Sequence, residues 1–278
     1  MSEPASTSSS PVEPRPAATV MLVRDSATGV EVFLMQRSAH GMFAGLHVFP
    51  GGKVDRSDHH AERWEAYARG PDDVAASATL GLDSGGLGYW VACIRECFEE
   101  AGILLALGAD GDTLRLHSPR VRTRFESWRT RLNDGEPNVF EAMCNEEKLR
   151  LATDQLAYVS HWITPIDQPR RYNTRFFVAR APARQEALHD GHETVESSWI
   201  RPEDALEKFR AGKLNLISPT FKNLEAIADY PTTEELLQAK RTIDPATIPT
   251  ILPRIISRES ETFEEILDVV GHGGRLSA

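Results

Sequence analysis

Short stretches of alternating or continuous apolar residues recur along the chain and predict β-strands. The first two are expected at 18–24 (ATVMLVR) and 30–37 (VEVFLMQR), with the turn sequence SATG before Val30. A third, shorter strand is expected at 47–49, after a glycine-punctuated loop. β-Branched and aromatic residues predict three later strands, at 159–164, 173–180 and 193–200.

Apolar residues at a spacing of three and four predict helices between these strands. The strongest pattern runs from Gly88 to Leu105 (GYWVACIRECFEEAGILL), where Gly102 is suited to the left-handed turn that ends a helix. The alternative is that residues 103–107 continue the helix a little further. The other helices are expected at 118–132, at 139–149 and from Pro202 to Gly212, where the proline and the glycine serve as start and stop signals. Between 59 and 87 an amphipathic piece, AERWEAYARG, predicts a helix followed by a loose loop.

The order of these elements indicates an α/β protein in which helices cover a mixed sheet. Residues 1–16 are rich in Ser and Pro with almost nothing to bury, so we expect a disordered tail, with ordered structure from about Ala17. The central domain is expected to span 17–230, with an insertion at about 59–87. Residues 231–278 are expected to form a helical extension at the C-terminus.

Composition narrows the classes of function. The chain has 278 residues, 41% of them hydrophobic, and a formal net charge of −10. This net negative charge makes a nucleic-acid partner unexpected, because such binding depends on clustered Lys and Arg. An anionic substrate is compatible if metal ions mediate the contact. No apolar run approaches membrane length, and the tail lacks the apolar core of a secretory signal. Three cysteines without zinc-site spacing fit a reducing cytoplasm. The oligomeric state is left open, with a homodimer as one possibility.

The candidate chemistry lies on the polar face of the predicted helix at 88–105. With about 3.6 residues per turn, Glu96, Glu99 and Glu100 share one face, while the apolar residues occupy the other. Like charges at this spacing repel each other, and Arg95 lies four residues before Glu99, where it can neutralise part of the charge. A divalent cation such as Mg²⁺ would account for the rest. The plain alternative is a solvated acidic face without a ligand.

This helix, together with the glycines before it, resembles the signature of the Nudix hydrolases, G-x5-E-x7-R-E-U-x-E-E-x-G-U, where U is a bulky aliphatic residue. The run Arg95-Glu96-Cys97-Phe98-Glu99-Glu100-Ala101-Gly102 matches its second half, and Phe49-Pro50-Gly51-Gly52 leads into its first. Asp58 stands where the family has its first Glu, about 29 residues are inserted before Arg95, and Cys97 replaces an aliphatic residue. The resemblance implies an α/β/α sandwich and a metal site formed by Glu96, Glu99, Glu100 and the carbonyl of Gly52.

Further segments are similar to the Nudix type 19 branch, which includes coenzyme A diphosphatases. They are QRSAHGMFAGLHVFPGG, HWITP with RRYNTRFF, and HETVESSWI with EDALEKF. The resemblance implies Mg²⁺- or Mn²⁺-dependent hydrolysis of a diphosphate in a small nucleotide-type substrate such as coenzyme A or an acyl-CoA. Four arginines are candidates for holding its phosphates: Arg37, Arg170, Arg171 and Arg175.

The expected mechanism assigns the general base to Glu99 and the orientation of the acids to Arg95. Asp190, Glu193 and Glu196 precede or open the last predicted strand, and one of them is an alternative base or an extra metal ligand. Two other functions remain open. One is a Nudix pyrophosphatase for NADH, ADP-ribose or damaged nucleotides, and the other is a catalytically silent Nudix-fold sensor.

Overall fold

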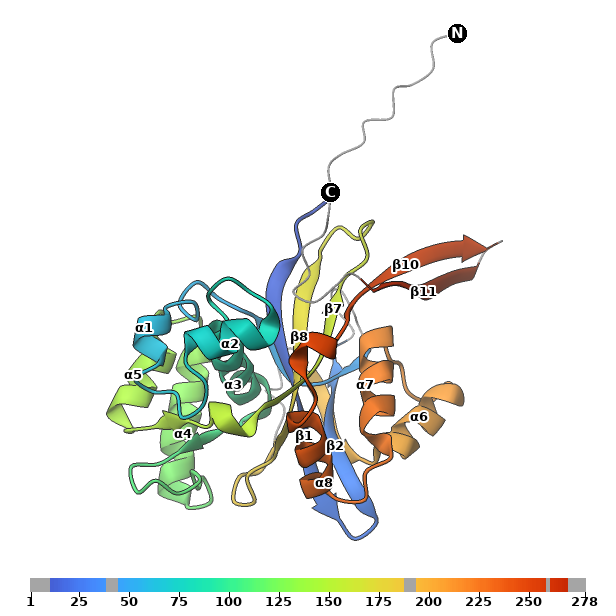
Figure 1. Cartoon of the computed structure of the whole chain (residues 1–278). Helices are drawn as coiled ribbons and strands as arrows, with labels where there is room; N and C mark the ends of the chain where they lie inside the picture. Colours follow the sequence, from blue (N-terminus) through green and yellow to red (C-terminus); the bar gives the residue numbers. More distant parts are fainter. Residues whose placement is uncertain (1–10, 39–44, 188–193, 259–260, 270–278) are drawn as a thin grey trace.

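The computed structural model describes residues 11–38, 45–187, 194–258 and 261–269, and within them a mixed sheet forms the middle of the molecule (Figure 1). The main path of strands has the order β11-β10-β7-β8-β1-β2-β3, while β4 pairs with β1 and β9 pairs with β2. The strands are β1 (Arg15–Ser26), β2 (Gly29–Arg37), β3 (His47–Val48), β4 (Gly51–Lys53), β7 (Ala157–Ile163), β8 (Tyr172–Arg180), β9 (Thr194–Ile200), β10 (Thr250–Arg258) and β11 (Glu261–Val269).

The sheet is mixed because β1 runs parallel to β8 and antiparallel to β2 and β4. Successive side chains of a strand point to opposite faces, so β1 contributes to two separate cores. Ala18, Val20 and Leu22 belong to one, and Met21 and Val23 to the other. Both faces of the sheet are therefore covered.

The first face is covered by the helices drawn on the left of Figure 1. They are α1 (Ala61–Trp64), α2 (Asp73–Leu80), α3 (Leu87–Ala101), α4 (Pro119–Asn133) and α5 (Val139–Glu146). A two-stranded sheet of β5 (Ala106–Leu107) and β6 (Arg150–Leu151) and a 3₁₀ turn, η1 (Thr153–Gln155), lie after α3 and α5. α3 packs directly on β1, which fixes its polar face relative to the sheet.

The second face is covered by α6 (Pro202–Arg210), α7 (Ser218–Ala228) and α8 (Thr233–Arg241) (Figure 1). Their buried side chains include Leu206, Leu224 and Leu236, which pack with the odd-numbered residues of β1. With helices on both faces of a mixed sheet, the predicted α/β/α sandwich is confirmed.

The segment inserted before α3 differs from the expected helix and loop. The amphipathic piece forms only the one-turn α1, whereas the Ala- and Ser-rich stretch forms α2, capped by Asp72 and ended by Gly81 in the left-handed conformation. Ala76 and Leu80 of α2 are fully buried in the core beside α3. The insertion is therefore part of the core and not only a surface loop.

The C-terminal extension is helical only in part. α8 and the 3₁₀ turn η2 (Pro245–Thr247) fit the expectation, but Thr250–Val269 forms the hairpin β10–β11. β10 pairs in parallel with β7 through Thr250 and Ile251, so the hairpin extends the sheet (Figure 1). Thr250, Ile251 and Ile255–Ile256 are β-branched, which favours strand over helix. Residues 1–10 of the predicted disordered tail lie outside the described residues.

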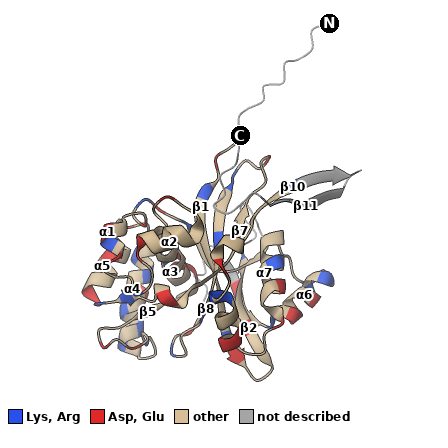
Figure 2. Ribbon diagram, in the orientation of Figure 1, with Lys and Arg blue, Asp and Glu red and all other residues tan. Residues whose placement is uncertain are grey.

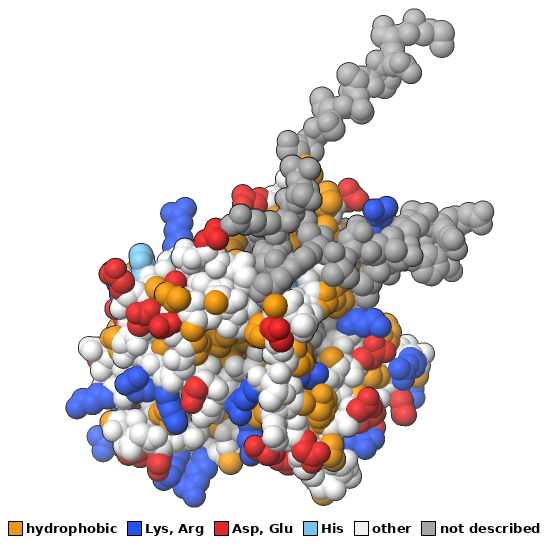
Figure 3. All heavy atoms as spheres, in the orientation of Figure 1, with side chains coloured by type: hydrophobic (Ala, Val, Ile, Leu, Met, Phe, Trp, Pro, Cys, Tyr) orange, Lys and Arg blue, Asp and Glu red, His pale blue; other side chains and the backbone are white. Residues whose placement is uncertain are grey.

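Charged residues of both signs are interspersed over the two helical layers (Figure 2). The face shown in Figure 3 carries small apolar patches between them and no continuous basic surface. Among the described residues, no helix has the length and apolar character needed to cross a membrane.

Candidate active site

The three predicted acids of α3 lie on the side of the helix away from its buried apolar residues. Trp90, Ile94 and Phe98 are buried on the core side of the helix. The side chains of Glu96 and Glu99 keep 15% and 18% of their surface exposed, and Glu100 is more buried, at 8% for the whole residue. The helix ends at Ala101, because Gly102 adopts φ 68° and its amide donates to the carbonyl of Phe98. Of the two ends that the sequence left open, the one at Gly102 is correct, and residues 103–107 do not continue the helix.

Arg95 gathers three carboxylates around one guanidinium. Its Nε and Nη2 donate to the two oxygens of Asp58 at 3.2 and 2.8 Å, and its Nη1 donates to Glu96 and Glu99 at 3.0 and 2.9 Å. Asp58 is 1% exposed and its Oδ2 also accepts from the amide of Asp55 at 2.8 Å. Asp58, which takes the slot of the family's first Glu, is thus held against the acidic helix across the whole insertion.

The glycine strand β4 lies against the same carboxylates. The amide of Gly51 donates to Glu100 Oε2 at 2.8 Å. A Cβ atom on Gly52 would collide with the carboxylate of Glu96, so only glycine permits this approach without displacing the acid. Pairing of Ala18 in β1 with Gly52 fixes the position of the glycine strand. The sequence indicated Gly52, but the contact of Gly51 was missed because it joins residues 49 positions apart.

Burial leaves the charges of these acids incompletely compensated. It raises the pKa of Glu96 to about 7, although the attraction of Arg95 opposes the shift. Burial also raises the pKa of Glu99, again opposed by Arg95. An additional cation beside these groups would favour their charged forms and lower both pKa values.

The donor set fits a hard divalent cation. Carboxylates of Glu96, Glu99 and Glu100 and a backbone carbonyl at Gly52 are the oxygen ligands that Mg²⁺ and Mn²⁺ prefer. In the part of the chain that the structure describes, no three such side chains already converge on one point. Arg95 and the amide of Gly51 hold the carboxylates instead, at hydrogen-bond distances. Each of these contacts uses one carboxylate oxygen, so a cation would require the side chains to rotate until their other oxygens converge.

The acids lie at one side of a long cleft of about 1280 Å³. Arg37, at the end of β2, and Arg170, before β8, line the same cleft. Other parts of its wall are apolar and come from both sides of the sheet edge: Val48, Phe49, Trp162, Ile163, Phe176, Ile217, Pro219 and Pro253. The cleft thus offers one ligand a cluster of acidic side chains suited to a cation, two arginines and an apolar surface.

Two of the four candidate arginines do not reach this cleft. Arg171 is 3% exposed, and it donates to the carbonyls of Thr164 at 3.0 Å and Val12 at 2.7 Å. Arg175 is 1% exposed in the core, where its Nη1 lies 3.2 Å from the hydroxyl of Tyr158. Arg171, directly before β8, thus ties the start of this strand to the segment before β1, and Arg175 contacts the neighbouring strand β7. Sequence reasoning missed these contacts because the partners are distant in the chain.

The alternative bases are not brought to the acids by the described structure. Asp190 and Glu193 lie outside the described residues. Glu196 is exposed on β9, opposite Gln36 of β2, and is not among the residues that line the cleft. Of the candidate bases that the structure describes, Glu99 is the one that lies in the acidic cluster, where Arg95 donates to it.

Comparisons with known proteins agree with this geometry. The family model of the NUDT19 Nudix domain matches residues 83–227. The acyl-coenzyme A diphosphatases NUDT19 of Xenopus laevis and Homo sapiens are 26% and 28% identical to this chain over 242 residues, which is 77% and 76% of it. These matches span 63% and 64% of the two relatives, just under two thirds of their length.

A solved structure shares the fold. The crystal structure of a NUDIX hydrolase from Alicyclobacillus acidocaldarius superposes with a TM-score of 0.68 at 26% identity, and the match covers 82% of this chain and 96% of that one. Since the family model covers more than half of the sequence, including the acidic helix and most of the second helical layer, this chain belongs to the NUDT19 Nudix domain family.

Proposed function

We propose that the protein is a divalent-metal-dependent Nudix hydrolase that cleaves the diphosphate linkage of coenzyme A or an acyl-CoA. The observation that carries the proposal is the cluster in which Arg95 holds Asp58, Glu96 and Glu99 beside the glycine strand, at one side of a cleft with an apolar wall. The printed names of the NUDT19 relatives, acyl-coenzyme A diphosphatases, support the same substrate class.

The shape of the cleft supports a long substrate of mixed polarity. Coenzyme A has a diphosphate, a separate 3′-phosphate and an extended pantetheine arm that can carry an acyl chain. Most small-molecule pockets enclose about 300–1,000 Å³, and the volume here, about 1280 Å³, is larger. The acids suit a metal at the diphosphate, while Trp162, Phe176 and Ile217 offer apolar surface for the arm.

In the proposed reaction the side chains of α3 have separate roles. Glu96 and Glu100, with the carbonyl of Gly52, hold Mg²⁺ or Mn²⁺, and Arg95 fixes the acids in position. The bound cation supplies Lewis acidity at the diphosphate and lowers the pKa of water. Glu99 accepts the proton of the attacking water while a P–O bond forms and the bridging P–O bond breaks. The hydrogen bond from Arg95 to Glu99, at 2.9 Å, supports this role because it orients the carboxylate beside the proposed ligands.

For the remaining phosphate we propose Arg170 and Arg37. Both line the cleft, and an arginine fork matches phosphate oxygens well. Arg171 and Arg175 are not assigned this role, since neither lines the cleft and both are almost fully buried.

A substrate panel tests the function. The purified chain is incubated with coenzyme A, acyl-CoAs of increasing length, NADH, ADP-ribose, diadenosine polyphosphates and nucleoside triphosphates, each with Mg²⁺, with Mn²⁺ and with EDTA. We expect coenzyme A or an acyl-CoA to give adenosine 3′,5′-bisphosphate and a phosphopantetheine product by mass spectrometry, only with metal. Preference for NADH, ADP-ribose or another nucleotide would replace the substrate assignment. Binding without turnover of any compound would indicate a sensor.

We also propose a reducing cytoplasm as the compartment. Cys93, Cys97 and Cys144 are free thiols buried in the core, and burial raises the pKa of each well above the usual range of a thiol. Such thiols behave as small apolar side chains and need no oxidising compartment. Subcellular fractionation with an antibody against the protein checks this assignment.

A further inference from the structure

The C-terminal end of α3 leaves backbone carbonyls that need partners. The last four carbonyls of a helix have no N–H donor within it, and here the amide of Gly102 donates only to that of Phe98. The next two carbonyls belong to Glu99 and Glu100, the acids proposed as base and ligand. Their positions therefore depend on what binds the end of the helix.

Arg129 of α4 binds both of these carbonyls. Its Nε donates to the carbonyl of Glu99 at 2.8 Å, and its Nη2 donates to that of Glu100 at 2.7 Å. Two donors on one edge of a planar guanidinium thus span two consecutive peptide groups. Lysine has no such fixed fork. The positive charge also suits the negative end of the helix dipole.

α4 packs in a fixed position against α3, so Arg129, as part of α4, can hold the end of α3 in place. Ser118 caps the start of α4, and Phe125 and Trp128 bury one side of it, at 2% and 6% exposed. The ring of Phe125 meets Phe98 of α3 edge to face, with centroids 6.4 Å apart. The contact of Arg129 therefore joins two helices that already share a core.

We propose that Arg129 is a positioning residue of the acidic site. By holding the carbonyls of Glu99 and Glu100, it fixes the last turn of α3 and with it the direction of both carboxylates. This inference rests on the proposed function for its catalytic consequence, but its effects on the helix end and on metal affinity can be measured without substrate. Partners one step beyond the ligands commonly change metal affinity or activity by about ten- to a hundredfold when they are removed.

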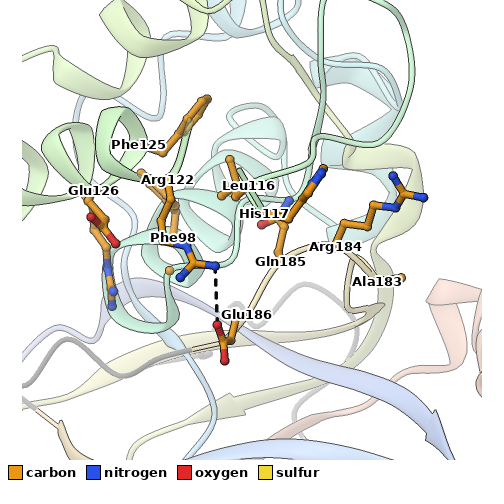
Figure 4. A pocket seen from close by; sticks show the side chains of 12 residues that line it. Phe98, Leu116, His117, Arg122, Phe125, Glu126, Ala183, Arg184, Gln185 and Glu186 are labelled. Atoms are coloured by element: carbon orange, nitrogen blue, oxygen red, sulfur yellow. Dashed lines mark ion pairs between the residues drawn. The ribbon is translucent and has the colours of Figure 1, made fainter. Parts of the chain in front are cut away.

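A pocket of about 270 Å³ beside Arg129 makes the contact accessible from solvent. Figure 4 shows its labelled walls: Phe98 and Phe125 from the two helices, Arg122 in an ion pair with Glu186, and the segment that carries Gln185. Arg129 and Gly102 also line it. If Arg129 is shortened to alanine, a free guanidinium ion can enter through this pocket and reach the vacated carbonyls.

The test compares Arg129→Ala and Arg129→Gln with Arg122→Ala. Arg122 is the matched control because it lies on the same helix and lines the same pocket, yet its ion pair with Glu186, at 3.9 Å, is away from the carbonyls of α3. Arg129→Gln keeps part of the side-chain volume and one NH2 group as donor. It is the second test variant, used if the alanine variant does not fold. Three measurements apply: hydrogen exchange without metal, Mn²⁺ affinity by electron paramagnetic resonance, and kinetics with and without methylguanidinium.

For both Arg129 variants we expect faster exchange confined to the last turn of α3 and Mn²⁺ affinity weaker by about ten- to a hundredfold. In the kinetics, kcat should fall more than KM rises. Methylguanidinium should restore part of the Mn²⁺ affinity and of kcat to Arg129→Ala and should not affect Arg122→Ala.

Mn²⁺ affinity in the Arg129 variants equal to that of Arg122→Ala would overturn the inference. So would a lower melting temperature with unchanged helix-end exchange, since Arg129 would then be only a structural contact. If the wild-type chain cleaves nothing in the substrate panel, the proposed function fails, while exchange and Mn²⁺ affinity still decide the role of Arg129.

Discussion

Replacing Arg95 with methionine removes the group on which the acidic cluster depends. Methionine keeps much of the length and volume of the side chain but has neither charge nor donor. Asp58 then loses both hydrogen bonds from the guanidinium and keeps only that from the amide of Asp55. Because Asp58 is 1% exposed, water cannot replace the lost donors.

The structure sets the size of the effect. Breaking a buried ion pair by removing one partner costs about 3–5 kcal/mol, because the remaining charge is uncompensated. The side chain of Arg95 is 8% exposed, so this contact is not discounted for solvent screening. For a chain of this size the cost corresponds to a lower melting temperature by about 2 °C per kcal/mol, or roughly 6–10 °C.

Melting in EDTA, followed by circular dichroism, measures this effect without metal. The control is the double variant Asp58→Asn with Arg95→Met, in which the buried group left behind is neutral. We expect the double variant to melt at a higher temperature than Arg95→Met alone, with a coupling of about 1–3 kcal/mol between the two sites. A melting temperature of Arg95→Met within 2 °C or so of the wild type would refute the idea that the Arg95–Asp58 pair holds this part of the fold together.

Three further predictions concern the site itself. Glu100→Gln should fold normally, because its amide oxygen can still accept from the amide of Gly51. Its kcat/KM should fall at least about a hundredfold, since a metal ligand is lost rather than an outer partner, and near wild-type turnover would remove Glu100 from the ligand set. Gly52→Ala should displace the carboxylate of Glu96 and weaken Mn²⁺ binding about tenfold or more by electron paramagnetic resonance, and unchanged affinity would show that the acid can move aside at no cost. Arg170→Ala should lower kcat/KM for coenzyme A about ten- to a hundredfold more than for dephospho-coenzyme A, because a charge-assisted contact of about 1.5–3 kcal/mol is lost. The neighbouring variant Arg171→Ala is the control, expected to lower the melting temperature and to affect both substrates equally, and the reverse result would exchange the two roles.

Local patterns were sufficient to predict the strands β1, β2, β3, β7, β8 and β9 and the acidic helix, but not the C-terminal hairpin β10–β11. The period of apolar residues in α3 predicted both the buried stripe and the shared face of its acids, and Gly102 predicted its end. The Arg95–Glu99 contact was also predictable, because residues four apart on a helix are neighbours. α2 was missed because its small residues give little amphipathic signal, although Asp72 as a cap and Gly81 as a stop were available as signals.

Contacts between distant segments could not be predicted in this way. Arg170 and Arg171 are adjacent in sequence and equal in charge, yet the first lines the cleft and the second is covered by the segment at Val12, 159 residues away. Nothing in the local sequence distinguishes them. Likewise, Arg129 looks like any other basic residue of α4, and its partners in α3 become apparent only when the two helices are packed together.

The contact between Asp58 and Arg95 shows how little a long inserted segment disturbs the spacing of the site. In the Nudix signature these two positions are eight residues apart, whereas here they are 37 apart and still joined. Lengthening a closed loop by this ratio costs only about 1.4 kcal/mol of chain entropy. Burying one side chain such as Leu80 of the inserted segment returns about 1.5–3 kcal/mol. Burial of a single leucine therefore offsets the chain entropy of the longer loop, and the contact between the two residues does not depend on a short connection.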